Sequence, residues 1–129
     1  MGGENLGEPI IDYEKAGHRI RVYKVGGEVK VIKDGRSIAQ TREALLLDED
    51  GHKPVYYIPI KDISGNILEP TSTSTTCPYK GVASYYNLNA GTEKVKDAVW
   101  QYLDSNEDFR AIRDYIAFYP NSIDQINVT

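Results

Sequence analysis

The sequence is poor in the residues that form cross-links and metal sites. It contains one cysteine, Cys77, which excludes an internal disulfide bond, and two histidines, His18 and His52. A structural zinc site is tetrahedral and draws mainly on cysteine and histidine ligands. We therefore expect no zinc site, and no motif indicates another cofactor.

Long apolar runs and an excess of basic residues are also missing. No run approaches the roughly 20 apolar residues of a membrane span, and the first residues lack the apolar core of a signal peptide. The net charge is −4, whereas nucleic-acid binding needs clustered lysine and arginine. The one basic run, residues 18–21, alternates like an exposed strand, and we interpret it as a solvated face. We expect no membrane or nucleic-acid partner and a cytoplasmic location.

Tyrosine dominates the aromatic residues. Ten tyrosines stand against two phenylalanines and one tryptophan. Tyrosine adds to its apolar ring a hydroxyl that needs a hydrogen-bond partner when it is buried. This excess predicts a partly wet surface, either a pocket or a broad, half-covered sheet.

The length of 129 residues fits a single domain. About seven short segments have the composition of strands, the first two with alternating β-branched residues, and no strand–helix alternation accompanies them. The segments are 19–25, 28–34, 43–49, 54–60, 81–89, 93–103 and 113–120. The sequence thus predicts one mainly β domain over residues 17–121, a flexible arm over 1–16 and a tail over 122–129.

Turn residues refine this prediction. Gly26 and Gly27 separate the first two segments, as expected for a β-hairpin. The hydroxyl-rich run 71–76 favours extended or turn structure. Residues 105–112 suit a short helical turn with Ser105 as its cap.

Seven short blocks carry a family resemblance: TREAL at 41–45, PVYYIP at 54–59, LEP at 68–70, TTCPYKG at 75–81, ASYY at 83–86, AVWQY at 98–102 and AFYP at 117–120. In this order they resemble a family of small bacterial and fungal domains of unknown function, whose hallmarks are CPYKG and AFYP. The resemblance covers residues 19–121. It implies a compact domain of antiparallel sheets packed at an angle, similar to the β-tent group.

The family is sometimes labelled nucleotidyltransferase-like, although no activity belongs firmly to it. Relatives in the β-tent group often bind zinc through paired cysteines, which this chain lacks. Polymerase-type nucleotidyltransferases place a Gly-Ser turn near paired carboxylates that hold magnesium. The nearest acids, residues 48–50, have no Gly-Ser before them, and we interpret them as a turn ending in Asp50-Gly51.

The TTCPYKG block holds the residues best placed for chemistry. Cys77 lies three positions before Lys80, a cation that would lower the pKa of the thiol in a tight turn. The alternatives for Cys77 are a non-covalent ligand contact and a small packing residue. Lys80 either binds an anion, acts as a base or Schiff-base lysine when desolvated, or is an ordinary surface lysine. Thr76 and Tyr79 flank these two residues and join the candidate site.

Three aromatic residues and one arginine complete the candidate site. Tyr57, Trp100 and Tyr119 alternate with aliphatic neighbours, which fits either an aromatic cleft or a core whose tyrosine hydroxyls reach the rim. Arg42 either pairs with a carboxylate or faces the same cleft.

These patterns favour a small-molecule-binding β-domain, with an anionic or planar ligand around residues 75–81. One alternative is an enzyme that uses Cys77 or Lys80 as nucleophile or acid–base group. The other is an interaction module that docks a partner through a strand edge or a tyrosine-rich patch.

Overall fold

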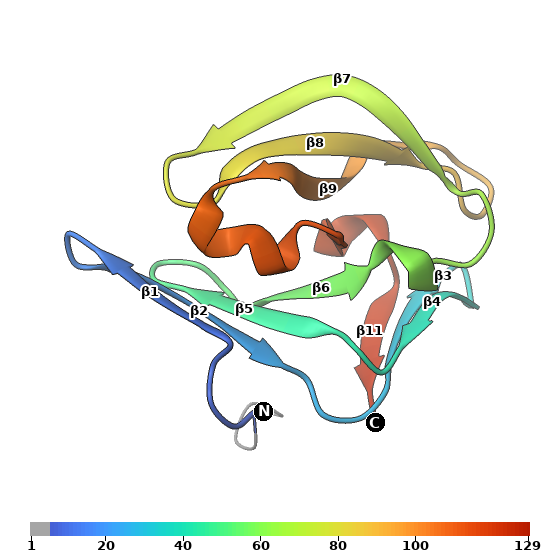
Figure 1. The fold of residues 1–129 in the computed structure, drawn as a ribbon. Helices are drawn as coiled ribbons and strands as arrows, with labels where there is room; N and C mark the ends of the chain where they lie inside the picture. Colours follow the sequence, from blue (N-terminus) through green and yellow to red (C-terminus); the bar gives the residue numbers. More distant parts are fainter. Residues whose placement is uncertain (1–5) are drawn as a thin grey trace.

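The computed structural model describes residues 6–129, whose elements are drawn in Figure 1. The strands are β1 (Ile11–Lys15), β2 (His18–Lys24), β3 (Val29–Lys33), β4 (Arg36–Thr41), β5 (Leu45–Glu49), β6 (Val55–Pro59), β7 (Leu68–Cys77), β8 (Gly81–Leu88), β9 (Val95–Ser105), β10 (Tyr115–Phe118) and β11 (Gln125–Val128). Short 3₁₀ helices lie between them: η2 (Ile60–Asp62), η3 (Glu107–Ile112) and η4 (Pro120–Ser122). Among the described residues, no helix has the length and apolar character of a membrane span.

Two antiparallel sheets form the domain. The large sheet has the order β1-β2-β5-β6-β10-β9-β8-β7, and the small sheet has the order β11-β3-β4. The large sheet folds back over itself, so that β7, β8 and β9 lie above β1, β2, β5 and β6, and the small sheet stands at one end (Figure 1). The predicted mainly β fold of antiparallel sheets packed at an angle is confirmed, and the large sheet does not close into a barrel.

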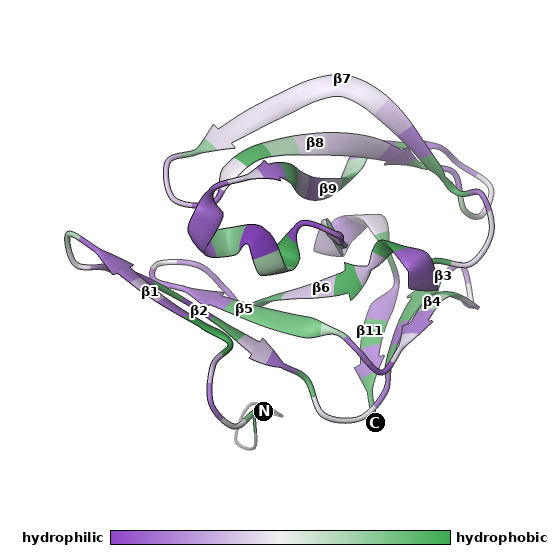
Figure 2. Cartoon of the chain, viewed as in Figure 1, coloured by the Kyte–Doolittle hydropathy of each residue, from purple (hydrophilic) through white to green (hydrophobic). Residues whose placement is uncertain are grey.

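The prediction of about seven strands is wrong, because the structure has eleven. The four that were missed, β1, β4, β7 and β11, are the edge strands of the two sheets. An edge strand has a neighbour on one side only and is commonly polar, which weakens the apolar alternation that marks a strand. Figure 2 shows this contrast between the apolar β5 and the polar β7.

Both terminal segments contribute to the sheets. β1 lies in the segment predicted as a flexible arm, and β11 lies in the predicted tail. β1 pairs with β2, and β11 pairs with β3. The described part of each segment therefore extends a sheet instead of forming a loose end. Residues 1–5 of the predicted arm lie outside the described residues.

The predicted hairpin around Gly26 and Gly27 is also wrong, because β2 and β3 belong to different sheets. Gly27 has a φ of 87°, and a side-chain carbon there would overlap the main-chain carbonyl oxygen of Thr129. Glu28 and Thr129 exchange main-chain hydrogen bonds of 3.1 and 2.9 Å. The glycine thus permits the close approach of the chain end beside β3, at the end of its pairing with β11, and does not form a two-residue turn.

Alternation along β5 separates two apolar clusters. Leu46 packs with the side chains of β3 and β4 in the cluster between the sheets. Leu45 and Leu47 point to the opposite face and join the cluster enclosed by the folded large sheet. Phe109 and Ile112 of η3, both fully buried, belong to this second cluster. The site described next lies on the same face of β5 as the second cluster.

Candidate functional site

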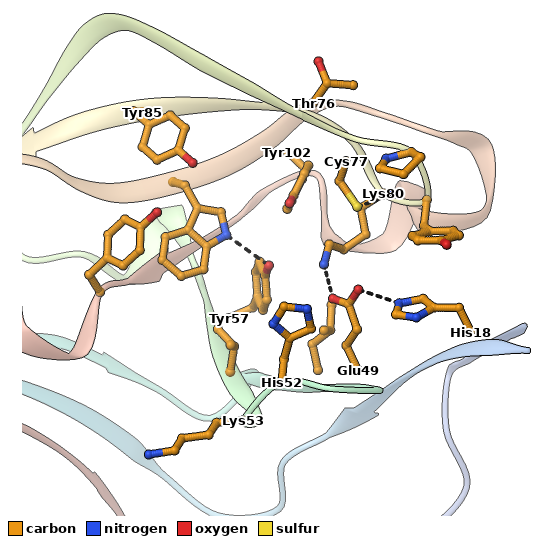
Figure 3. A pocket seen from close by; sticks show the side chains of 16 residues that line it. His18, Glu49, His52, Lys53, Tyr57, Thr76, Cys77, Lys80, Tyr85 and Tyr102 are labelled. Carbon is orange, nitrogen blue, oxygen red and sulfur yellow. Dashed lines mark hydrogen bonds and ion pairs between the residues drawn. The ribbon is translucent and has the colours of Figure 1, made fainter.

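Three connections of the large sheet contribute to one pocket of about 570 Å³ (Figure 3). His18 follows the β1–β2 turn, His52 and Lys53 lie in the β5–β6 loop, and Tyr79 and Lys80 lie in the β7–β8 turn. The pocket is therefore assembled from segments that are far apart in the sequence.

Aromatic side chains form the inner wall of the pocket. Tyr57 of β6, Tyr85 of β8, and Trp100 and Tyr102 of β9 line it, with Tyr119 after β10. The indole N–H of Trp100 donates to the Tyr57 hydroxyl at 3.2 Å, and the two rings meet edge to face with centroids 6.4 Å apart. The Trp100 ring also lies 4.6 Å from the Tyr119 ring. These contacts hold the aromatic faces in fixed positions along the wall.

A buried ion pair lies beside this wall. The Lys80 ammonium donates to Oε1 of Glu49, while Nε2 of His18 lies 2.8 Å from Oε2 of the same carboxylate. Lys80 and Glu49 are each only 8% exposed. Removing two charges from water is costly, and such a pair persists only where its geometry and further hydrogen bonds compensate. Both oxygens of Glu49 are engaged in this way.

Burial and hydrogen bonding set the protonation states of the side chains that line the wall. Burial opposes ionisation of Glu49, but the hydrogen bonds from Lys80 and His18 outweigh it and hold the pKa of this carboxyl below its ordinary value. Glu49 is therefore an anion at neutral pH. Burial raises the pKa of the Tyr57 and Tyr102 hydroxyls well above the ordinary tyrosine value. Both phenols consequently keep their protons at neutral pH.

The β7–β8 turn is fastened so that it presents Lys80 to the pocket. The main-chain N–H of Lys80 donates to the sulfur of Cys77 at 3.4 Å. Asn106 holds the turn from the far end of β9: its main-chain N–H donates to the Lys80 carbonyl at 2.8 Å, and its side-chain amide donates to the Tyr79 carbonyl at 2.9 Å. Gly81, with a φ of 119°, lets the chain pass directly against β9.

Replacing Asn106 with alanine is expected to lower the free energy of unfolding by about 1 kcal/mol, since a side-chain hydrogen bond to the turn is lost. Urea denaturation measures this change. Asn121→Ala is the matched control, because Asn121 is exposed in η4 and makes no side-chain hydrogen bond to any residue in 6–129. Equal losses in the two variants would show that Asn106 does not fasten the turn.

Most of the candidate residues named from the sequence lie together. The pocket is lined by seven of the eight: Tyr57, Thr76, Cys77, Tyr79, Lys80, Trp100 and Tyr119. Arg42 does not join them. It is exposed and lines a separate hollow with Lys24 and Tyr115, because it precedes β5 whereas Glu49 ends that strand. Among the described residues Arg42 forms no ion pair either.

The sequence analysis left two residues of the pocket, His18 and Glu49, out of the candidate site. His18 was placed on a solvated face, and Glu49 was interpreted as part of a turn. In the structure His18 bonds Glu49 and stacks on Tyr79, with the rings 4.4 Å apart and 16° from parallel. Strand alternation could have placed both residues on the buried face. Glu49 lies two positions after Leu47, and His18 lies two positions before Ile20, so each shares a face with a buried residue.

The acids next to Glu49 do not form a metal site with it. Asp48 and Asp50 are exposed, and Asp50 accepts a hydrogen bond from the main-chain N–H of Arg19 at 3.0 Å. Across residues 6–129, no three histidine, cysteine or acidic side chains are grouped so as to hold a metal ion.

A family model described as Domain of unknown function (DUF427) matches residues 21–129. No curated protein matches the chain.

Proposed function

Since the chain belongs to the DUF427 family of domains of unknown function, we propose a function from the pocket itself: the chain binds a small, planar, polar molecule there. The observation that carries this proposal is the buried Lys80–Glu49 pair beside a pocket of ligand size. Apolar residues of similar volume would stabilise a purely structural core at least as well as a buried ion pair. Polar groups that converge on a mainly apolar cavity are typical of a binding site.

The lining residues favour a planar ligand. The rings of Trp100, Tyr57 and Tyr119 offer flat surfaces and edges against which a conjugated ring packs well. Lys53 and His52 are exposed at the mouth of the pocket, where the Lys53 charge would attract an anionic ligand. The side chains around Lys80 thus support a ligand with one flat part and one polar part.

The single tryptophan of the chain provides a direct test. Trp100 lines the pocket, so its indole N–H gives one assignable resonance in a ¹H–¹⁵N spectrum. Titration with planar probes, including uncharged 2-naphthol and anionic 2-naphthoate, is expected to shift this resonance saturably. Tyr119→Ala removes an exposed part of the wall and is expected to weaken binding about five-fold, on the order of 1 kcal/mol of lost ring contact.

Tyr23→Ala is the control for this titration, because Tyr23 lies on β2 and does not line the pocket. It is expected to leave the affinity unchanged. A resonance that stays in place with every planar probe would contradict the proposed function. Equal weakening by Tyr119→Ala and Tyr23→Ala would contradict the proposed location.

A further inference from the structure

The inner wall of the pocket holds more hydrogen-bond donors than acceptors. The Lys80 ammonium has three N–H donors, and one of them goes to Glu49. The Tyr57 hydroxyl accepts from Trp100, so its own proton is still free to be donated. The Tyr102 hydroxyl makes no hydrogen bond to any residue in the described part of the chain. Three side chains therefore retain donors that the protein does not use.

Both carboxylate oxygens of the wall already accept a hydrogen bond. Glu49 contributes the only carboxylate of the lining, and its oxygens take hydrogen bonds from Lys80 and His18. The Tyr85 hydroxyl lies 2.9 Å from the hydroxyl of Thr75 and is satisfied there. The donors of Lys80, Tyr57 and Tyr102 thus remain unused although the Glu49 carboxylate and the Tyr85 hydroxyl already have their partners.

The residues that carry the unused donors are largely buried, and their polar ends face the same space. Tyr57 is 2% exposed, and Tyr102 and Lys80 are each 8% exposed. The Lys80 ammonium lies 5.7 Å from the centre of the Tyr102 ring, and Figure 3 shows the hydroxyls of Tyr57 and Tyr102 directed into the cavity beside it. Among the described residues, only Nε of Arg21 and Nε of Arg113 are buried side-chain polar atoms without a hydrogen-bond partner, so the Tyr102 hydroxyl keeps access to the solvent in the pocket. A ligand oxygen that displaces this solvent can accept the hydrogen bonds that water would otherwise accept.

We propose that this inner end of the pocket is an oxyanion subsite, in which Lys80, Tyr57 and Tyr102 bind an anionic oxygen of the ligand. The inference rests on the proposed function and narrows it to a chemical class: planar, conjugated carboxylates. A carboxylate offers only lone pairs, so it complements a wall of donors, whereas the NH₂ of a carboxamide would face those donors. The ring of such a ligand would lie toward Trp100 and Tyr119, next to the subsite.

Three probes separate the contributions of the oxygen and the ring. 2-Naphthoate carries both, 2-naphthamide keeps the ring without the anion, and acetate keeps the anion without the ring. Dissociation constants are measured from the Trp100 indole resonance at pH 7. We expect 2-naphthoate to bind at least ten-fold more tightly than 2-naphthamide, and also more tightly than acetate.

Tyr102→Phe tests the subsite directly, because it removes one hydroxyl from a side chain of nearly unchanged volume. The preference for 2-naphthoate over 2-naphthamide is expected to fall at least five-fold. Tyr86→Phe is the matched control, since the Tyr86 hydroxyl donates to Gln101 and Tyr86 does not line the pocket. In that variant the preference is expected to be unchanged.

The outcomes distinguish the subsite from the proposed function. Equal affinities for the carboxylate and the amide, or a preference that survives Tyr102→Phe, would overturn the subsite while planar ligand binding stands. Acetate binding as tightly as 2-naphthoate would overturn the assignment to conjugated carboxylates. If neither 2-naphthoate nor 2-naphthamide binds, the subsite is overturned. The proposed function is overturned with it only if 2-naphthol does not bind either.

Discussion

Replacing Gly81 with alanine is expected to lower the free energy of unfolding by about 4 kcal/mol, combining backbone strain with overpacking. Gly81 has a φ of 119°, which L-residues rarely adopt. An added Cβ would overlap the carbonyl oxygen of Asp104 and lie 2.8 Å from both the Asn106 nitrogen and the Ser105 Cα. All three are main-chain or Cα atoms of the neighbouring strand end, so no flexible side chain can move aside.

Gly17→Ala is the control for this experiment. Gly17 also has a positive φ, 84°, but an added Cβ there would meet nothing within 4 Å. It is expected to cost only about 1 kcal/mol, from backbone strain alone. Both losses are measured by urea denaturation. Similar losses in the two variants would show that the contact between the β7–β8 turn and β9 is not tight.

The second large effect is expected from breaking the buried ion pair. Glu49→Leu leaves the Lys80 ammonium buried without its partner, which is expected to cost about 3 kcal/mol of unfolding free energy. Glu49→Leu combined with Lys80→Met removes both charges and is expected to recover most of that loss, because an apolar pair of similar volume often replaces a buried ion pair without penalty. A double-mutant cycle measures the coupling.

The adjacent acid supplies the matched control. Asp48 is exposed on the opposite face of β5, so Asp48→Asn is expected to change stability by no more than about 0.5 kcal/mol. A double variant as unstable as the sum of the single variants would contradict the predicted coupling between Lys80 and Glu49.

The contribution of Glu49 to the free energy of unfolding is expected to depend on pH. Because the folded-state pKa of Glu49 lies below its ordinary value of 4.5, its ionised form contributes stability above pH 4.5. That contribution is lost as the pH falls through the folded-state pKa. The difference in stability between the wild type and Glu49→Leu should therefore be large at pH 7 and smaller at pH 3. A difference that grows under acid conditions would contradict the lowered pKa.

The sequence predicted the interior of the sheets better than their borders. Strands with neighbours on both sides, such as β5 and β6, carry runs of consecutive apolar residues because each of their faces meets a core. β7 is ten residues long, yet it consists largely of hydroxyl side chains and contains Pro70. Proline and polar residues are tolerated at a sheet border and argue against a central strand. Local sequence therefore left residues 71–76 between extended and turn structure.

The sequence singled out most of the side chains that line the pocket, but not the partner of Lys80. Cys77, Tyr79 and Lys80 belong to one turn, and the pattern of the turn was sufficient to single them out. Glu49 lies 31 positions before Lys80 and became its partner through tertiary structure. The incorrect hairpin concealed the contact between His18 and Glu49, because it paired β2 with β3, whereas the true register places Ile20 of β2 opposite Glu49 of β5.

The order of strands in the large sheet has a consequence for how the protein folds. β1, β2, β5 and β6 come from the first half of the chain, β7 to β10 come from the second, and a single pairing, β6 with β10, joins the two groups. That junction brings Pro59 opposite Tyr115, so it closes a long loop and carries a high entropic cost. Glu49 and Tyr57 lie on one side of this seam, and Lys80 and Trp100 lie on the other. The pocket therefore forms only once the two halves have docked, and its ion pair between Lys80 and Glu49 joins the halves across this junction.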